Sequence, residues 1–242
     1  TRYPKIKGLL TSLFKEQLAY LEKYYQFVTV EECINACYSG ASFPSNAILL
    51  TFDDGYIDHY TNVFPLLEEK GIQGAFFPPA KAILENRVLD VNKIHFILAQ
   101  NITTRDLLND VLKCLDKHRK KYSLRSNDYY FSKFAKESPW DSKEIVFIKY
   151  LLQVGLEEKL RNLIVDELFH KYVSDNEEVF SKELYMNIDQ MRCMVRSGMY
   201  IGSHGYSHYW MNKIPPSVQE QEISLSLNLL EEVGSPTNNW MM

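Results

Sequence analysis

Strand and helix patterns alternate along both ends of this chain, and the alternation limits the fold more than any other feature. The run from Ala47 to Phe52 is almost entirely apolar, as in a strand that is buried on both faces of a parallel sheet. A helical pattern over 62–70, which Gly71 is expected to end, and a short apolar strand over 75–77 follow it. Strands that alternate with helices are typical of α/β proteins with a parallel sheet, so we predict that class of fold.

The N-terminal part supplies further elements of the same kind. Apolar residues recur at helical spacing over 12–25, and a short strand follows at 27–28. Thr29 with Glu32 forms a capping-box pattern, which predicts a helix that ends near Gly40.

The alternation fails between residues 81 and 184, where helical periodicity dominates. The predicted helices span 91–100, 103–121, 141–152 and 157–172. Alternation then resumes, with a helix capped by Asn187, a strand over 199–202, and a last helix opened by Ser217 with Glu220 and closed by Gly234. We therefore predict a helical insertion over 81–184, between segments 1–80 and 185–242 that share one α/β domain.

Composition and charge narrow the class of partner. The net charge is −4 over 242 residues with no long basic block, which argues against nucleic acid. No apolar run is long enough to span a bilayer, and the first residues have no signal-peptide pattern, so we expect none. The four cysteines form no Cys-x-x-Cys pair, so we expect a reduced, cytoplasmic protein rather than a secreted one.

Residues suited to metal chemistry follow two of the predicted strands. Asp53 and Asp54 end the first strand, and His204 and His208 follow the strand over 199–202. The carboxyl ends of parallel strands form the active-site edge of such folds, so we expect these side chains to meet. Two histidines and one carboxylate are a common set of catalytic zinc ligands, and the second aspartate remains free as a base.

Each cluster also has a purely structural interpretation. Asp-Gly after a strand is a frequent turn, and His204 and His208 taken alone are better explained as surface or core side chains. Asp58 and His59 are expected to be a helix-start acid and a surface histidine. His95, His118 and His170 are expected on solvated helix faces. Only the combination of two acids and two histidines at two strand ends favours a metal site.

The two clusters resemble the signature motifs of a known family. Thr51-Phe52-Asp53-Asp54-Gly55 resembles the first motif of the polysaccharide deacetylases, carbohydrate esterase family 4, also known as the NodB homology domain. Ser203-His204-Gly205-Tyr206-Ser207-His208 resembles its second motif, His-Ser/Thr-x-x-His. The resemblance covers roughly residues 10–80 and 185–242 and leaves the helical insertion outside.

The resemblance implies a fold, a reaction and residue roles. The fold is a distorted (β/α)7 barrel, and the reaction is hydrolysis of an N-acetyl, sometimes O-acetyl, group on a sugar or polysaccharide. It implies that Asp53 is the catalytic base and that Asp54, His204 and His208 are the ligands of a divalent metal. Zinc is the first candidate for this metal, and cobalt, nickel, iron and manganese are alternatives. Tyr206 and Trp210 flank the second motif and could stack on a sugar ring, although core packing explains them equally well.

Three departures from the family pattern are expected to matter. Gly205 stands where the family usually has Ser or Thr. The later motifs, which would supply an arginine and a general-acid histidine, are not found, so a catalytically inactive carbohydrate-binding protein stays an alternative. We expect an incomplete barrel that lacks strands after Met242 and one before Thr1, with open edges that leave an oligomer possible. A phosphatase with a nucleophilic aspartate is set aside, because it needs aspartates two apart and Gly55 occupies that place.

Overall fold

The computed structural model describes residues 3, 5–6 and 8–237, and it separates into two compact units. We call them the sheet unit (Gly8–Arg87 and Glu178–Met242) and the helical unit (Thr1–Lys7 and Val88–Glu177). Within the described part of the chain, no helix is both long and apolar enough to cross a membrane.

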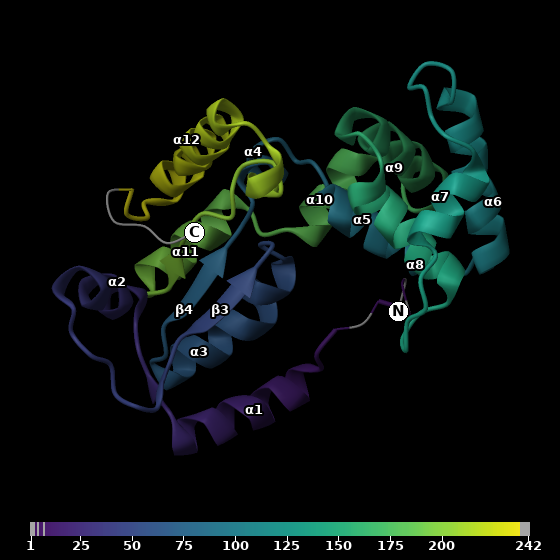
Figure 1. Ribbon diagram of the computed structural model, residues 1–242. Coiled ribbons are helices and arrows are strands. Elements are labelled where there is room, and N and C mark those ends of the chain that lie inside the picture. The colour runs from purple at the N-terminus through teal and green to yellow at the C-terminus, as the bar shows by residue number, and fades with distance from the viewer. Residues whose placement is uncertain (1–2, 4, 7, 238–242) are drawn as a thin grey trace. The chain divides into compact units, whose positions relative to one another are not determined.

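The elements follow one another in the order shown in Figure 1. The first part of the sheet unit contains α1 (Thr11–Tyr24), β1 (Gln26–Phe27), α2 (Val30–Ser39), β2 (Ala47–Ile48), β3 (Leu50–Asp53), the π-helical turn η1 (His59–Val63), α3 (Phe64–Lys70), β4 (Gly74–Phe77) and α4 (Ala80–Leu84). Its second part contains α10 (Glu177–Leu184), α11 (Ile188–Arg196), β5 (Tyr200–Ile201), the 3-10 turn η3 (Met211–Lys213) and α12 (Pro216–Val233). The first residue of α10, Glu177, is assigned to the helical unit. The helical unit contains α5 (Asp90–Leu98), α6 (Thr104–His118), α7 (Asn127–Phe134), α8 (Lys143–Tyr150), the π-helical turn η2 (Leu151–Gly155) and α9 (Glu158–Tyr172).

A parallel sheet of order β3-β4-β5 forms the centre of the sheet unit. Thr51 pairs with Ala75 and Phe76 pairs with Ile201, so β4 lies between two strands that are distant in sequence. All four residues of β4 are buried, as expected for the middle strand. Because the strands are parallel, β3 and β5 end at the same edge, which is where the two predicted clusters begin.

Helices pack on both faces of this sheet, as Figure 1 shows and as the alternating strand pattern predicts. On one face, Val30 of α2 packs with Ala75 and Phe77. On the other face the Phe76 ring stacks on Phe52 at 4.8 Å, and Leu67 of α3 lies against the strand. The predicted α/β class is therefore confirmed, and the five described strands form a three-stranded and a two-stranded parallel sheet. The expectations about strands before Thr1 and after Met242 lie outside the described residues.

The prediction of one continuous strand over 47–52 is wrong, because the segment changes its pairing strand at Leu49. Ile48 lies in β2 and pairs with Phe27, in a two-stranded sheet separate from the main one. Leu50 begins β3 and pairs with Gly74. An apolar run predicts burial but not which strand lies beside it, so periodicity could not reveal this division.

Helix ends follow the predicted capping chemistry in most places. The reciprocal capping box of Thr29 and Glu32 starts α2, and α3 ends at Gly71, a glycine in the left-handed conformation. The helix predicted over 62–70 is preceded by the π-helical turn η1, which takes in its first two residues. The cap predicted at Ser217 is wrong, since α12 starts one residue earlier at Pro216, whose fixed φ suits the first helical position.

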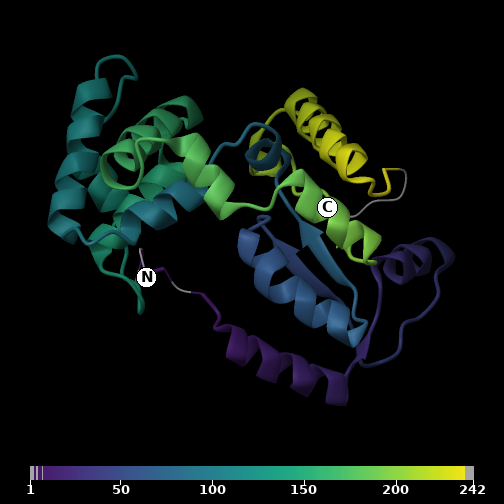
Figure 2. The ribbon, with the colours of Figure 1, turned by 180° about the vertical axis from the view of Figure 1, so that it is seen from behind.

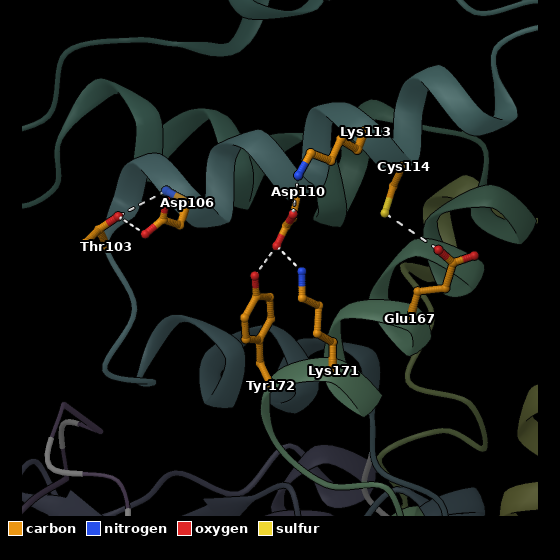
Figure 3. A network of polar contacts seen from close by, with 8 residues as sticks. All are labelled: Thr103, Asp106, Asp110, Lys113, Cys114, Glu167, Lys171 and Tyr172. Atoms are coloured by element: carbon orange, nitrogen blue, oxygen red, sulfur yellow. Dashed lines mark hydrogen bonds and ion pairs between the residues drawn. The ribbon is translucent and has the colours of Figure 1, made fainter.

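The helical unit is stabilised by polar contacts as well as by apolar packing. Asp110 of α6 accepts hydrogen bonds from Lys171 and Tyr172 of α9, and Lys113 lies 3.2 Å away on its other side (Figure 3). Burial opposes ionisation of Asp110, but the bonds from Lys171 and Tyr172 outweigh it and lower the pKa to about 2. Burial raises the pKa of the Cys114 thiol to about 11, so it stays protonated and points toward a carboxylate of α9, as Figure 3 shows.

A buried lysine holds three parts of the helical unit together. The Lys93 side chain is only 3% exposed, and its Nζ lies 2.5 Å from Asp166 and 2.9 Å from Glu177. Glu177 also accepts the N–H of Val88, so it connects both ends of the unit. The expectation of a solvated face was wrong for His118, whose largely buried side chain lies 3.5 Å from Glu167.

Candidate metal centre

The turn after β3 has a backbone that only a restricted set of residues can form. Asp54 and Gly55 both have positive φ, at 71° and 65°. The Asp54 N–H donates to the carbonyl of Phe77 (3.1 Å), which ties the turn to the end of β4. A Cβ on Gly55 would lie 2.7 Å from Cβ of Pro78, so glycine is required for space as well as for φ. The Asp53-Asp54-Gly55 segment is therefore a turn, but one held in a demanding conformation.

The second cluster lies on a loop that begins where β5 ends. The Gly202 N–H donates to the Phe76 carbonyl (2.8 Å), which continues the sheet into this loop. The carbonyls of Gly205 and Tyr206 then accept hydrogen bonds from the N–H groups of Ala80 and Lys81 at 3.1 and 3.0 Å. We call residues 203–208 the histidine loop. The two hydrogen bonds to Ala80 and Lys81 tie the histidine loop to the segment that follows β4.

The histidine loop also rests on two buried polar side chains of α12. Ser226 Oγ lies 2.8 Å from Ser203 Oγ, and the Ser207 N–H donates to Oε2 of Glu222 at 2.6 Å. Both α12 residues are buried. Nothing in the sequence motif itself pointed to them.

The turn and the loop bring one carboxylate and two imidazoles together. Oδ1 of Asp54 lies 3.6 Å from Nε2 of His204 and 3.6 Å from Nε2 of His208, and the two Nε2 atoms are 3.1 Å apart. One ligand atom from each residue lies within 4.8 Å of the other two. A carboxylate oxygen and two imidazole nitrogens are donors that zinc and neighbouring divalent metals accept. The donor set therefore fits a metal ion.

Two of these three residues have an unusual backbone conformation. Asp54 and His208, at φ 71° and 60°, are two of the four described non-glycine residues with positive φ. Side chains with this backbone conformation are uncommon, and they concentrate at functional sites.

The electrostatics of the group suit ligation by neutral imidazole and ionised carboxylate. Burial acts to raise the pKa of Asp54, but the imidazoles of His204 and His208 and the Tyr56 hydroxyl together lower it. Tyr56 donates to Oδ2 of Asp54 at 3.2 Å, which leaves Oδ1 toward the histidines. Burial and the neighbouring His204 lower the pKa of His208, against the opposing effect of Asp54 and Asp53. Both shifts favour the protonation states that bind metals.

The remaining predicted site residues surround this group. Asp53 ends β3 with an exposed side chain, directly before Asp54. Trp210 is 67% exposed, so core packing does not explain it. Tyr206 donates its hydroxyl to Glu85, and burial together with that carboxylate raises the Tyr206 pKa to about 12.

His59 differs from the expected surface histidine. It is half-buried, with the rings of Phe52, Tyr56 and Phe76 at centroid distances of 5.7 to 5.8 Å. Its Nδ1 has no hydrogen-bond partner among the described residues. Burial lowers the pKa of His59 to about 4, although Asp54 and two other aspartates oppose the shift. The π-helical turn places this side chain beside the sheet, and a pattern search for α-helices does not detect such a turn.

The sheet unit is thus an α/β fold with one carboxylate and two imidazoles gathered at the carboxyl edge of its central sheet. A family model for polysaccharide deacetylase matches residues 40–118 and 171–242, more than half of the chain. The chain therefore belongs to the polysaccharide deacetylase family.

Individual relatives are similar over shorter stretches. The poly-beta-1,6-N-acetyl-D-glucosamine N-deacetylases of Escherichia coli strains K12 and O157:H7 are each 46% identical over 65 residues, which is 26% of this chain. The matched stretch is 10% of their length, so the chain corresponds to a small part of these curated relatives.

Two solved structures are similar to almost the whole chain. IcaB from Ammonifex degensii has a TM-score of 0.50 and 17% identity, over 98% of this chain and 68% of that one. The Streptococcus pyogenes deacetylase PplD in complex with acetate has a TM-score of 0.49 and 15% identity, over 96% of this chain and 62% of that one. The likeness to IcaB concerns the fold.

Proposed function

We propose that this chain is part of a metal-dependent deacetylase that hydrolyses N-acetyl groups on a polysaccharide. The observation that carries the proposal is the convergence of Asp54, His204 and His208, whose ligand atoms lie within 4.8 Å of one another. Membership of the polysaccharide deacetylase family supports the reaction class. The names of the curated relatives make poly-β-1,6-N-acetylglucosamine the first substrate to test.

Asp54, His204 and His208 would hold the metal, with zinc as the first candidate and cobalt, nickel, iron or manganese as alternatives. A bound divalent ion would supply a Lewis acid that polarises the acetyl carbonyl and lowers the pKa of a water molecule. The protein itself supplies the ligand geometry. Tyr56 and the two imidazoles keep the Asp54 carboxylate ionised and oriented, and burial keeps His208 neutral.

Asp53 is the residue that we assign as general base. The Asp54 carboxylate is already engaged by the two imidazoles and Tyr56, whereas Asp53 is exposed at the same strand end. In the proposed reaction a water oxygen attacks the acetyl carbon while Asp53 takes a proton from that water. The C–N bond then breaks as the leaving nitrogen takes up the proton held by Asp53, which releases acetate, leaves a free amine on the sugar and returns Asp53 to its carboxylate form.

Substrate contact is assigned to the exposed aromatic surface beside the histidine loop. Trp210 follows His208 by two residues and presents most of its indole to solvent. An exposed indole offers a flat apolar face with a polar N–H, which suits stacking on a sugar ring. The Tyr206 hydroxyl is occupied by Glu85, so we assign Tyr206 a supporting contact through its ring.

Acetate release from zinc-loaded protein with a poly-β-1,6-N-acetylglucosamine oligomer tests the proposal. Asp53→Asn should slow release on the order of 10²–10⁴-fold, because the amide cannot accept the proton, and it should still bind zinc. Asp58→Asn, which changes another exposed acid in the same segment, is the matched control and should keep its activity. An Asp53→Asn variant with near-normal rates would show that another residue is the base. Wild-type protein that binds zinc and glycan without releasing acetate would favour the inactive carbohydrate-binding alternative.

A further inference from the structure

Two buried polar residues of α12 lie beneath the histidine loop, and no signature motif includes them. We propose that Glu222 and Ser226 are positioning residues that hold His204 and His208 in place for a metal ion. The inference rests on the proposed metal site, and its test below separates the two. Neither residue would touch the metal or the substrate; each acts through the backbone of the loop.

The spacing of the two residues matches the spacing of the two histidines. Glu222 and Ser226 are four positions apart in α12, so they lie on the same face of the helix. Ser226 contacts Ser203, the residue directly before His204. Glu222 accepts the N–H of the residue directly before His208. One helix face therefore holds the chain immediately ahead of each ligand.

The rest of α12 keeps this face in place. The helix packs against α11 and against α4, and both packing partners are visible in Figures 1 and 2. Leu229 and Leu230, in the turn after Ser226, are almost fully buried. A rigid, well-packed helix is a better support for a ligand loop than another loop would be.

The hydrogen bonds at Ser226 form a chain with a definite direction. The Ser226 hydroxyl donates to the carbonyl of Ile223 at 2.7 Å, so its oxygen accepts the hydroxyl proton of Ser203. Ser203 Oγ in turn accepts the N–H of Gly205 at 3.1 Å. Each hydroxyl donates once and accepts once, which holds the loop on both sides of His204.

Glu222 supports the loop next to His208 in the same way, and it does so through a carboxylate group. Its side chain is 5% exposed, and a buried carboxylate is retained only where hydrogen-bond donors compensate for the lost water. The Ser207 N–H supplies such a donor at 2.6 Å, in a charge-assisted hydrogen bond. This bond fixes the peptide just before His208, whose φ of 60° L-residues rarely adopt. Without that restraint the backbone would relax, and the imidazole would move away from Asp54.

Gly205 lies between the two supported positions of the histidine loop and next to the Glu222 carboxylate. Its φ is 72°, and a Cβ there would lie 3.8 Å from Oε2 of Glu222. Gly205 itself carries no side chain, and the contacts of α12 with Ser203 and Ser207 support the histidine loop on either side of it.

The experiment measures zinc affinity by chelator competition, and amide hydrogen exchange at Ser207 in the zinc-free protein. Glu222→Ala should weaken zinc binding about 10–100-fold, the usual effect of removing a group that orients a metal ligand. Exchange at Ser207 should accelerate by a similar factor. Glu222→Gln should stay within about threefold of wild type in both measurements, because the amide oxygen still accepts the Ser207 N–H.

Exposed residues of the same helix provide matched controls. Glu220→Ala and Ser224→Ala remove the same side chains from solvated positions and should leave zinc affinity unchanged. Ser226→Ala should weaken zinc binding about three- to tenfold, and it carries the test if Glu222→Ala does not fold. A role in packing alone would lower thermal stability without this difference between the Ala and Gln variants at position 222.

Two outcomes separate the inference from the proposed metal site. If Asp54→Ala abolishes zinc binding while Glu222→Ala and Ser226→Ala bind zinc as tightly as wild type, the inference is wrong and the metal site stands. If Asp54→Ala binds zinc normally, the proposed metal site is wrong. In that case the inference that Glu222 and Ser226 position metal ligands is wrong as well.

Discussion

Replacement of Gly55 by alanine would test how strongly the turn beside Asp54 is constrained. Gly55 has φ 65°, and an added Cβ would lie 2.7 Å from Cβ and 3.2 Å from Cα of Pro78. Gly71, in the same unit, has φ 63° and nothing within 4 Å of the corresponding Cβ position. The two glycines share the same backbone requirement and differ in space, so Gly71→Ala is a matched control.

The two contributions to the expected destabilisation can be separated. Alanine in the left-handed conformation costs about 1–2 kcal/mol, and the less flexible unfolded chain returns about 0.4–1 kcal/mol of this. Gly71→Ala should therefore lower the free energy of unfolding by about 1 kcal/mol. Gly55→Ala adds overpacking against a rigid proline ring, typically about 1–3 kcal/mol. Its total effect should be about 2–4 kcal/mol.

Urea unfolding followed by far-ultraviolet circular dichroism measures both variants, and zinc affinity adds a local readout. Because Gly55 follows Asp54 directly, Gly55→Ala should also weaken zinc binding at least about tenfold, whereas Gly71→Ala should not. Equal destabilisation of the two variants would show that the close approach to Pro78 is absent in solution. Unchanged zinc affinity in Gly55→Ala would show that the turn does not position Asp54.

Three further predictions concern other parts of the molecule. Tyr56→Phe removes the hydroxyl that donates to Asp54 and should weaken zinc binding about tenfold in chelator competition; unchanged affinity would show that this bond does not orient the carboxylate. Lys93→Met removes the ammonium group that lies beside the buried carboxylate of Glu177, and it should lower the free energy of unfolding by about 3–5 kcal/mol in urea denaturation. A decrease below about 1 kcal/mol would contradict this expectation. Burial lowers the pKa of His59 from about 6.5 to about 4, so its contribution to stability is complete above pH 6.5 and is lost as the pH falls toward 4. The loss should reach about 3 kcal/mol and should be missing in His59→Phe; an identical pH dependence of unfolding in both proteins would refute it.

Local chemistry explains which parts of the fold were predictable from sequence. The capping box at Thr29 and the ending of α3 at Gly71 depend on side chains within a few residues, and both were predicted correctly. The convergence of Asp54 with His204 and His208 could be expected because parallel strands end at one edge. These are features for which the sequence alone contains the physical cause.

Other features depend on neighbours that are distant in sequence. The change of partner at Leu49 depends on which strand lies beside it, and a continuous apolar run carries no such information. The burial of His59 depends on a π-helical turn that places its ring against Phe76. In the sequence, Glu222 is not distinguished from the other acidic residues of its helix. One signal was present, because Glu222 and Ser226 are four positions apart on an otherwise apolar helix face, a pattern that indicates buried polar contacts.

The order of the sheet also determines when it can form during synthesis. β4 pairs with β5 through Ala75 and Tyr200, which are 125 positions apart, and residues 88–177 of the helical unit are translated between them. A ribosome adds about 5–20 residues per second, so β4 leaves it about 6–25 s before β5 is available. Helices α5 to α9 are complete before β5 is made, so they can pack on one another during that interval. The nascent chain therefore holds the β5-facing edge of this wholly apolar strand unpaired until β5 is made, and an unpaired strand edge of this kind can pair with other chains.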